Sequence, residues 1–274
     1  MCTIGTVFDG QTIHTFKQCD LIPVTEFNEP QTRAGSNGVV SYTALTRGDG
    51  SGRLWAGSNS SGVSFVAADA YITSANYYVT DEQTGALFAA YEKSISNFTT
   101  ATAAADFLAG FYEDMGSGTG FPAPDISLLT GWADEAQTQP VSIFLEYMPR
   151  PYLHAPVRRI IRHAGHFAST NHFRIQPEAI HYPANHSTYL RLSRAELLLQ
   201  QDPAHAGIMS VLTDQYYGRC ELSICRETDY PNEEFQTQAT ALFSANPGLA
   251  PVCEYQVNGN PLTNPLQTYE GAAA

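Results

Sequence analysis

A cysteine follows the first methionine, in the sequence Met1-Cys2-Thr3-Ile4-Gly5. Methionine aminopeptidase removes a methionine when the next residue is this small, so we expect Cys2 to become the first residue of the mature chain. An N-terminal cysteine carries both a thiol and a free α-amine, and the unperturbed pKa of that amine, about 7.7–8.0, suits it to act as the base for the thiol. Cys2 could therefore supply a nucleophile and its base on one residue.

Two charged residues, Lys17 and Asp20, follow a predicted hairpin that begins at Cys2. Residues 2–17 read as a strand, a turn at Asp9-Gly10 and a second strand. Pairing of these strands brings the polar end of the second beside the start of the first. There Asp20 could hold the α-ammonium or the thiol, and Lys17 could favour a thiolate. The alternative is that the two residues form only a surface ion pair.

The rest of the chain alternates between strand pairs and helix pairs. Apolar residues spaced three and four apart predict two helices between residues 81 and 115, and similar patterns predict helices at 189–201 and near 208–217. Apolar, β-branched runs predict further strands at 38–45, 63–68, 128–132, 141–147, 158–169, 236–243 and 251–257. This order suggests stacked sheets with helices outside them, in one domain over residues 1–274 from which Met1 is removed.

Composition excludes several classes of protein. The 274 residues carry 14 basic and 27 acidic side chains, a net charge of −13 that would repel a nucleic acid. No run of 18 apolar residues and no signal peptide is present, so we expect a cytoplasmic protein without a membrane partner. The five cysteines are odd in number and lack metal-site spacing, which argues against a disulfide scaffold or a zinc ribbon.

The segment Cys2-Thr3, followed after the turn by Phe16-Lys17-Gln18-Cys19-Asp20, resembles the N-terminal-nucleophile (Ntn) cysteine hydrolases. The resemblance is to the superfamily of choloylglycine hydrolase, penicillin V acylase and acyl-coenzyme A:6-aminopenicillanic acid acyltransferase. In that superfamily the cysteine opens the mature chain, and a basic residue and an aspartate follow on the next strand. Here these are Lys17, where arginine is commoner, and Asp20.

Three later segments extend this resemblance. Residues 57–69 resemble a family stretch that ends at an oxyanion-hole position, here Asp69, where relatives commonly have Asn or Tyr and use the backbone N–H. Residues 166–173 resemble a Thr-Asn motif whose amide completes the oxyanion hole, which implies that role for Asn171. Residues 187–191 resemble a helix start that supplies a late active-site arginine, implied here to be Arg191 or, in another register, Arg194.

The resemblance implies an α+β fold of four αββα layers with two mainly antiparallel sheets, and it implies an amidohydrolase that needs no cofactor or metal. The Cys2 thiolate would attack a linear amide and form an acyl-Cys2 intermediate, which water then hydrolyses. An N-acyltransferase that uses an amide, coenzyme A or carrier-protein thioester donor is an alternative, as is a silent relative that binds a ligand. The loops at 70–80 and 116–127 could accept an aromatic or fatty acyl group. Relatives are often multimers, so a homo-oligomer is possible.

Two other clusters offer rival sites. Five of the eight histidines fall at 163–186, but His163 and His166 lie in a predicted strand and turn, where a spacing of three does not put them on one face for zinc. The basic group Arg158, Arg159 and Arg162 is expected to be a solvated strand edge. Alternatively, these three arginines could bind the phosphates of coenzyme A or of a phosphopantetheine carrier.

Overall fold

The computed structural model describes residues 1–36, 38, 40–70, 81–117, 125–148, 157–175, 182–227 and 235–270. Strands β1 (Cys2–Asp9) and β2 (Thr12–Leu21) form the predicted antiparallel hairpin, in which Cys2 lies opposite Cys19. Gly10 closes the turn with a φ of +60°, which glycine adopts without steric cost. The hairpin thus places the polar end of β2 beside the start of the chain.

The hairpin lies at the centre of a six-stranded sheet with the order β10-β1-β2-β11-β12-β13. Strand β10 (His166–Ser169) pairs with β1, and β11 (Gln236–Ala245) pairs with β2. Strands β12 (Val252–Val257) and β13 (Gln267–Tyr269) complete the sheet. Cys2 is therefore surrounded by strands that come from the two ends of the sequence.

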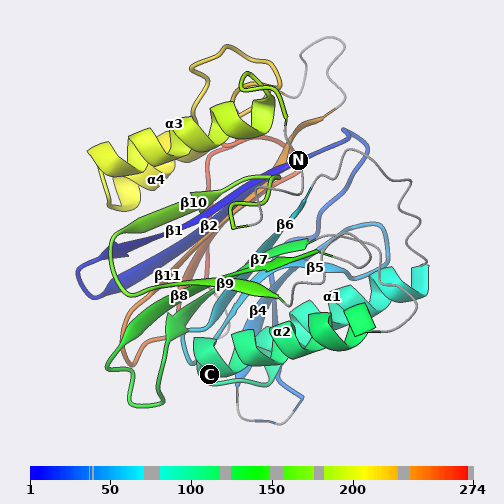
Figure 1. Cartoon of the computed structure of the whole chain (residues 1–274), viewed down its shortest axis with the longest axis vertical. Helices are drawn as coiled ribbons and strands as arrows, with labels where there is room; N and C mark the ends of the chain where they lie inside the picture. The colour runs from blue at the N-terminus through cyan, green and yellow to red at the C-terminus, as the bar shows by residue number, and fades with distance from the viewer. Residues whose placement is uncertain are drawn as a thin grey trace.

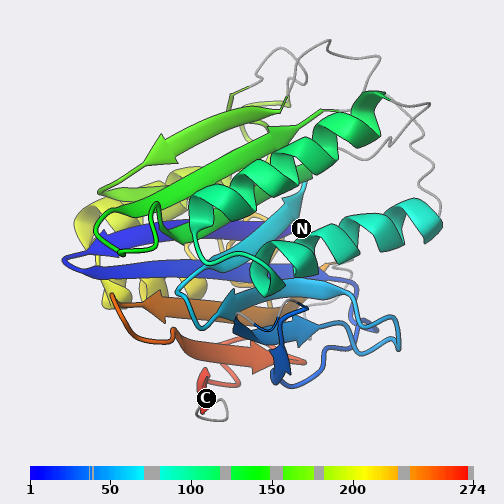
Figure 2. The ribbon, with the colours of Figure 1, turned by 90° about the horizontal axis from the view of Figure 1, so that it is seen from below.

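The second sheet has seven strands in sequential order, with antiparallel pairing between neighbours. They are β3 (Gln31–Ala34), β4 (Ser41–Thr46), β5 (Leu54–Asn59), β6 (Ser64–Asp69), β7 (Asp125–Trp132), β8 (Pro140–Tyr147) and β9 (Arg158–Arg162). The described part of the chain thus folds into a six-stranded and a seven-stranded sheet. The two sheets lie against one another in Figures 1 and 2.

Helices cover the outer faces of both sheets (Figures 1 and 2). Helices α1 (Asp81–Ser96) and α2 (Ala101–Ser117) pack on the seven-stranded sheet, while α3 (Ser187–Gln201) and α4 (His205–Leu212) pack on the six-stranded one. Between the sheets lies a third cluster of buried side chains, which includes Cys2 and Cys19. These four layers confirm the predicted αββα architecture. No helix among the described residues combines the length and apolarity needed to cross a membrane.

Some predicted elements differ from the observed ones. The run 158–169 was predicted as one strand, but it forms β9 and β10, which belong to different sheets and are joined through Gly165 at a φ of +78°. Strand β5 escaped prediction because glycine, serine and asparagine follow its apolar start. Gly57 is needed there, since a Cβ atom would lie 2.4 Å from the Cδ1 atom of Ile95 on α1. The last helix begins at His205 and ends at Leu212, earlier than predicted.

Candidate active site

Cys2 is held by its backbone on both sides. Its N–H donates to Oδ1 of Asn171 at 2.8 Å, and its carbonyl accepts a hydrogen bond from Arg191 at 2.7 Å. Met1 continues the strand pairing, because it exchanges backbone hydrogen bonds with Asp20 in both directions. Cys2 and Cys19 are therefore a non-hydrogen-bonded pair, whose side chains point to the same face and approach closely. Their sulfur atoms are 3.9 Å apart.

Asn171 links Cys2 to the second sheet. It follows β10, and its Nδ2 donates to the backbone carbonyl of Asp69, at the end of β6, at 2.7 Å. Its Oδ1 accepts both from Cys2 and from Arg191, and its backbone N–H donates to Oγ1 of Thr188 on α3. The amide of Asn171 is thus fixed in rotation, with its donor end beside Asp69 and its acceptor end beside Cys2.

Arg191 is fully buried and reaches from α3 to the first strand. Besides Cys2 and Asn171 it contacts Oγ1 of Thr3, and its Nε donates to Ser187 at the start of its own helix. Arg194, the competing register, instead pairs with Asp214 and lies over the ring of Tyr216. The structure therefore places Arg191, and not Arg194, against Cys2.

Lys17 and the two thiols form a buried electrostatic group. The Lys17 ammonium donates to the carbonyl of Trp55 at 3.1 Å. Burial by itself would lower the pKa of Lys17, but the Cys19 and Cys2 thiolates and the Asp69 carboxylate outweigh it and raise that pKa. A hydrogen bond from the Cys2 thiol, assisted by Lys17, lowers the pKa of Cys19 to about 6. The same contact with Cys19, together with burial, raises the pKa of Cys2. The pair therefore loses one proton readily and its second proton with difficulty.

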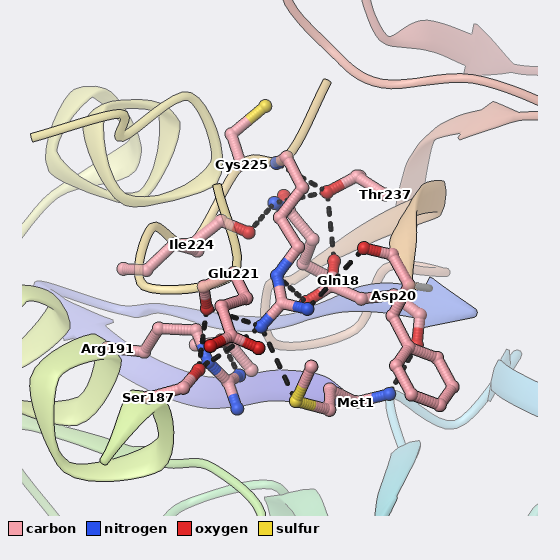
Figure 3. Close-up of polar contacts among 12 residues, drawn as sticks. Met1, Gln18, Asp20, Ser187, Arg191, Glu221, Ile224, Cys225 and Thr237 are labelled. Atoms are coloured by element: carbon pink, nitrogen blue, oxygen red, sulfur yellow. Dashed lines mark hydrogen bonds and ion pairs between the residues drawn. The ribbon is translucent and has the colours of Figure 1, made fainter. Parts of the chain in front are cut away.

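Asp20 lies beside an arginine that the sequence patterns did not reveal (Figure 3). The Asp20 carboxylate accepts from Thr237 at 2.9 Å and lies 3.4 Å from Nε of Arg226, and both charged side chains are fully buried. Arg226 also donates to the sulfur of Met1 and to Ser187. Because Arg226 lies in an irregular segment between α4 and β11, neither periodicity nor a motif marks it. The only signal is that a charged Asp20 inside a strand needs a partner.

A pocket opens beside these residues. It has a volume of about 190 Å³, and the polar residues at its wall include Cys2, Lys17, Cys19, Asp69 and Arg47. Its other walls are mainly apolar and come from β2, β5, β6 and α1: Leu21, Leu54, Trp55, Ala67, Leu87 and Phe88. The Cys2 thiol thus borders a small, mainly apolar chamber between a sheet and a helix.

Comparisons with known proteins agree with this arrangement. Residues 143–258 match the family described as acyl-coenzyme A:6-aminopenicillanic acid acyl-transferase. A search of the curated proteins finds no match. Among solved structures, the Caenorhabditis elegans N-acylethanolamine-hydrolyzing acid amidase ortholog is similar, with a TM-score of 0.52 and 14% identity over 90% of this chain and 94% of that one.

Two bacterial structures are similar to the same extent. Penicillin V acylase from Agrobacterium tumefaciens has a TM-score of 0.51 and 14% identity over 94% of this chain and 83% of that one. A mutant conjugated bile acid hydrolase from Clostridium perfringens has a TM-score of 0.52 and 11% identity, covering 98% and 97%. The chain has the Ntn hydrolase fold. The resemblance noted in the sequence, to the superfamily of choloylglycine hydrolase and its relatives, agrees with these structures in fold and with the family match over residues 143–258.

Within the Ntn fold, four of the five residues predicted to act with Cys2 border it or its pocket. Lys17, Asp69, Asn171 and Arg191 contact Cys2, its neighbours or the pocket wall. Asp20 pairs with Met1 through its backbone, while its carboxylate faces Arg226 and Thr237. Their catalytic roles stay predictions.

The rival clusters of the sequence are dispersed in the Ntn fold. His163 lies near Pro140, His166 near Glu196, and His172 is buried against Thr188 and Tyr189. His186 caps α3, and His181 lies outside the described residues. The three arginines belong to the edge strand β9 and turn to different partners: Ile175 for Arg158, Asp106 for Arg159 and the Phe167 ring for Arg162. Most of the two loops predicted to line the pocket, residues 71–80 and 118–124, also lies outside the described part.

Proposed function

We propose that this chain is a cysteine amidohydrolase that cleaves a linear amide through an acyl-Cys2 intermediate. The observation that carries the proposal is the junction of Cys2, Asn171 and Asp69. A strand-borne thiol borders a pocket, and its own N–H lies 2.8 Å from an amide that also reaches the end of β6. The family match over residues 143–258 supports acyl chemistry of this kind.

In the proposed mechanism, removal of Met1 turns the N–H of Cys2 into a free amine. Oδ1 of Asn171, which accepts from that nitrogen, would orient the amine, and Asp20 would assist from the adjacent end of β2. The amine takes the thiol proton while Sγ attacks the substrate carbonyl. Lys17 favours the thiolate, because its ammonium lies beside both sulfur atoms.

Attack by Sγ places a negative charge on the carbonyl oxygen of the substrate, which hydrogen-bond donors must stabilise. The backbone N–H of Asp69 and Nδ2 of Asn171 are proposed for this role, and one such donor is worth about 2.7–4 kcal/mol to the transition state. Nδ2 donates to the Asp69 carbonyl in this structure, so it would exchange that acceptor for the substrate oxygen. The α-amine then passes its proton to the leaving amine, which departs and leaves the acyl group on Cys2.

Water resolves the intermediate when the α-amine takes one of its protons and the hydroxide adds to the thioester carbonyl. Cys2 leaves as the thiol, and the product is a carboxylic acid. A second candidate is transfer of the acyl group to an amine, from an amide or from a coenzyme A or carrier thioester. The match to an acyltransferase family supports acyl transfer as this second candidate. Because both reactions share the acyl-Cys2 step, only the final acceptor separates them.

The first prediction concerns Cys2 itself. Intact-mass measurement should show loss of Met1, and an acyl thioester or electrophilic lactone should add one acyl group to the peptide that contains Cys2. A screen of N-acyl amino acids, bile-salt conjugates, penicillins and acyl thioesters, with and without an added amine, should find turnover that Cys2→Ala abolishes. Cys253→Ala, which changes a buried thiol on β12, is the matched control and should remain active. Full activity in Cys2→Ala would refute the mechanism, and an absence of any Cys2 adduct would favour a ligand-binding relative.

A further inference from the structure

Arg47 lies at the wall of the Cys2 pocket, and its side chain has no hydrogen-bond or ion-pair partner among the described residues. It follows β4, and the Nε atom is buried and has no hydrogen-bond partner among the described residues. A charged donor that lacks an acceptor is costly away from water, so a guanidinium of this kind in a pocket wall indicates an anionic ligand for its other N–H groups.

The position of Arg47 is fixed rather than accidental. Its backbone N–H donates to Arg53 across the β4–β5 connection, its carbonyl accepts from Asn28, and it forms a β-bridge with Phe27. Its guanidinium lies over the ring of Phe27, 5.5 Å from the centroid, and that ring in turn packs edge-on against Trp55. A guanidinium held this way presents its remaining donors in a set direction, which suits a planar anion.

Among the described residues Arg47 forms no ion pair, although its charge helps to lower the pKa of Cys19 and of Asp49. The Lys17 ammonium is bound to the carbonyl of Trp55 and lies in the field of the Asp69 carboxylate and of the two thiols. Asp49, the nearest acid in the sequence, is exposed and accepts from Ser51. The described part of the pocket therefore offers a thiol at Cys2, apolar walls and one guanidinium without a hydrogen-bonded anion.

We propose that Arg47 binds a carboxylate of the substrate, so that the enzyme prefers small linear amides with a carboxylate on the part that fills this pocket. The inference rests on the proposed function, because it names the substrate class of the same site. The volume of about 190 Å³ is below the roughly 300–1,000 Å³ typical of sites for drug-sized ligands, so the group between carbonyl and carboxylate is short. Monoamides of short dicarboxylic acids and N-acyl amino acids both meet this description.

Matched substrates test the proposal. We would compare the mono-para-nitroanilide of glutaric acid, which keeps a free carboxylate, with the same compound carrying a carboxamide there. An N-acyl amino acid and its amide form the second pair, which shows whether the carboxylate belongs on the acyl or the amine half. The wild-type chain should prefer the carboxylate member of one pair by roughly ten- to a hundred-fold in kcat/KM, as for a charge-assisted hydrogen bond.

Three variants separate charge from packing. Arg47→Met should remove the preference, measured as the ratio of kcat/KM between the two members of a pair, and Arg47→Lys should keep part of it. Arg159→Met, which removes an arginine from the β9 edge, is the control and should keep all of it. An equal rate for both members in the wild type, or a preference that survives in Arg47→Met, would overturn the proposal.

A binding measurement keeps the proposal separate from catalysis. Calorimetry with the Cys2→Ala chain should show the carboxylate anilide binding at least ten-fold more tightly than the carboxamide, and Arg47→Met in that background should abolish the difference. Selective binding without turnover in the active chain would reject the hydrolase but retain the anion site. Turnover without selective binding would retain the hydrolase and reject the anion site.

Discussion

At the scale of single residues, the contact between Cys2 and Cys19 sets the acidity of the site. The two thiols face each other across the hairpin, and Lys17 lies in the same buried group. Loss of the first proton is favourable because the remaining S–H donates to the thiolate and the ammonium attracts it. Loss of the second would place two negative charges side by side. The hydrogen bond from Cys2 accordingly lowers the pKa of Cys19 to about 6, and the pKa of Cys2 is raised.

We therefore predict that Cys19→Ser changes the pH dependence of thiolate formation. In the wild type, ultraviolet thiolate absorbance should show one step near pH 6. In Cys19→Ser that step should disappear, because the group with the lowered pKa is gone and the remaining Cys2 is buried. Cys253→Ser should keep the step, since burial raises the pKa of Cys253 and it contributes no thiolate there. A step near pH 6 that persists in Cys19→Ser would assign the lowered pKa to Cys2 instead.

At the scale of elements, one asparagine joins the β5–β6 turn to the end of α1. Oδ1 of Asn59 accepts from the N–H groups of Ser61 and Val63, both at 3.0 Å. Its Nδ2 donates to the carbonyls of Ile95 and Phe98, both at 2.8 Å. The side chain is buried, so these four bonds have no water to replace them. Asn59 thus positions both the strand that ends at Asp69 and the helix that walls the pocket.

The prediction is that Asn59→Ala costs roughly 3–5 kcal/mol of unfolding free energy, since several buried groups lose their partners at about 1–3 kcal/mol each. Urea denaturation followed by circular dichroism measures this cost. Asn59→Asp keeps the two acceptor contacts but points a buried carboxylate oxygen at the carbonyls of Ile95 and Phe98, so it should cost at least as much. Asn185→Ala, at an exposed loop position, is the control and should change stability by less than about 0.5 kcal/mol. Equal stability of Asn59→Ala and the wild type would show that the four hydrogen bonds of the Asn59 side chain contribute little to the free energy of unfolding.

The sequence predicted correctly those elements that short-range patterns determine. The hairpin at Cys2 follows from apolar alternation around Asp9-Gly10, and α1 and α2 follow from three- and four-residue spacing, all short-range patterns. It missed Arg226 because the pairing with Asp20 joins an irregular segment to a strand more than two hundred residues earlier. It also missed that the two halves of the run 158–169 enter different sheets, since a turn near His163 and His166 does not show which sheet the next strand joins. Arg47 had no motif either, because only the fold brings it to Cys2.

At the scale of the whole molecule, Asp125 ties both outer helices of one layer to the sheet beneath. It lies on β7, is buried, and accepts from Tyr91 of α1 at 2.5 Å and from Tyr112 of α2. Burial raises its pKa to about 6, although the two tyrosine hydroxyls oppose the rise. Because the folded pKa lies above the unfolded value of 3.8, the folded state holds the proton longer than the unfolded state as pH rises.

The expected result is that this group's contribution to stability is complete below pH 3.8 and is lost as pH rises from there to about 6. The loss amounts to roughly 3 kcal/mol, at 1.36 kcal/mol for each pKa unit. Asp125→Asn cannot ionise, so its unfolding free energy, measured by urea denaturation, should fall less over this range. Asp106→Asn, which removes an exposed carboxylate from α2, controls for the loss of one acid. Identical slopes in Asp125→Asn and the wild type would contradict the assignment.

The central place of β1 also sets an order of events in synthesis. Its neighbours are β2 and β10, and β2 in turn needs β11, which ends at Ala245. The sheet around the nucleophile thus cannot close until most of the chain has left the ribosome, because pairings so distant in sequence form late. Until then the start of the chain is open to an aminopeptidase, and afterwards Met1 is paired with Asp20. If Met1 is removed as proposed, its removal therefore has a time window, which begins with translation and ends when the sheet closes.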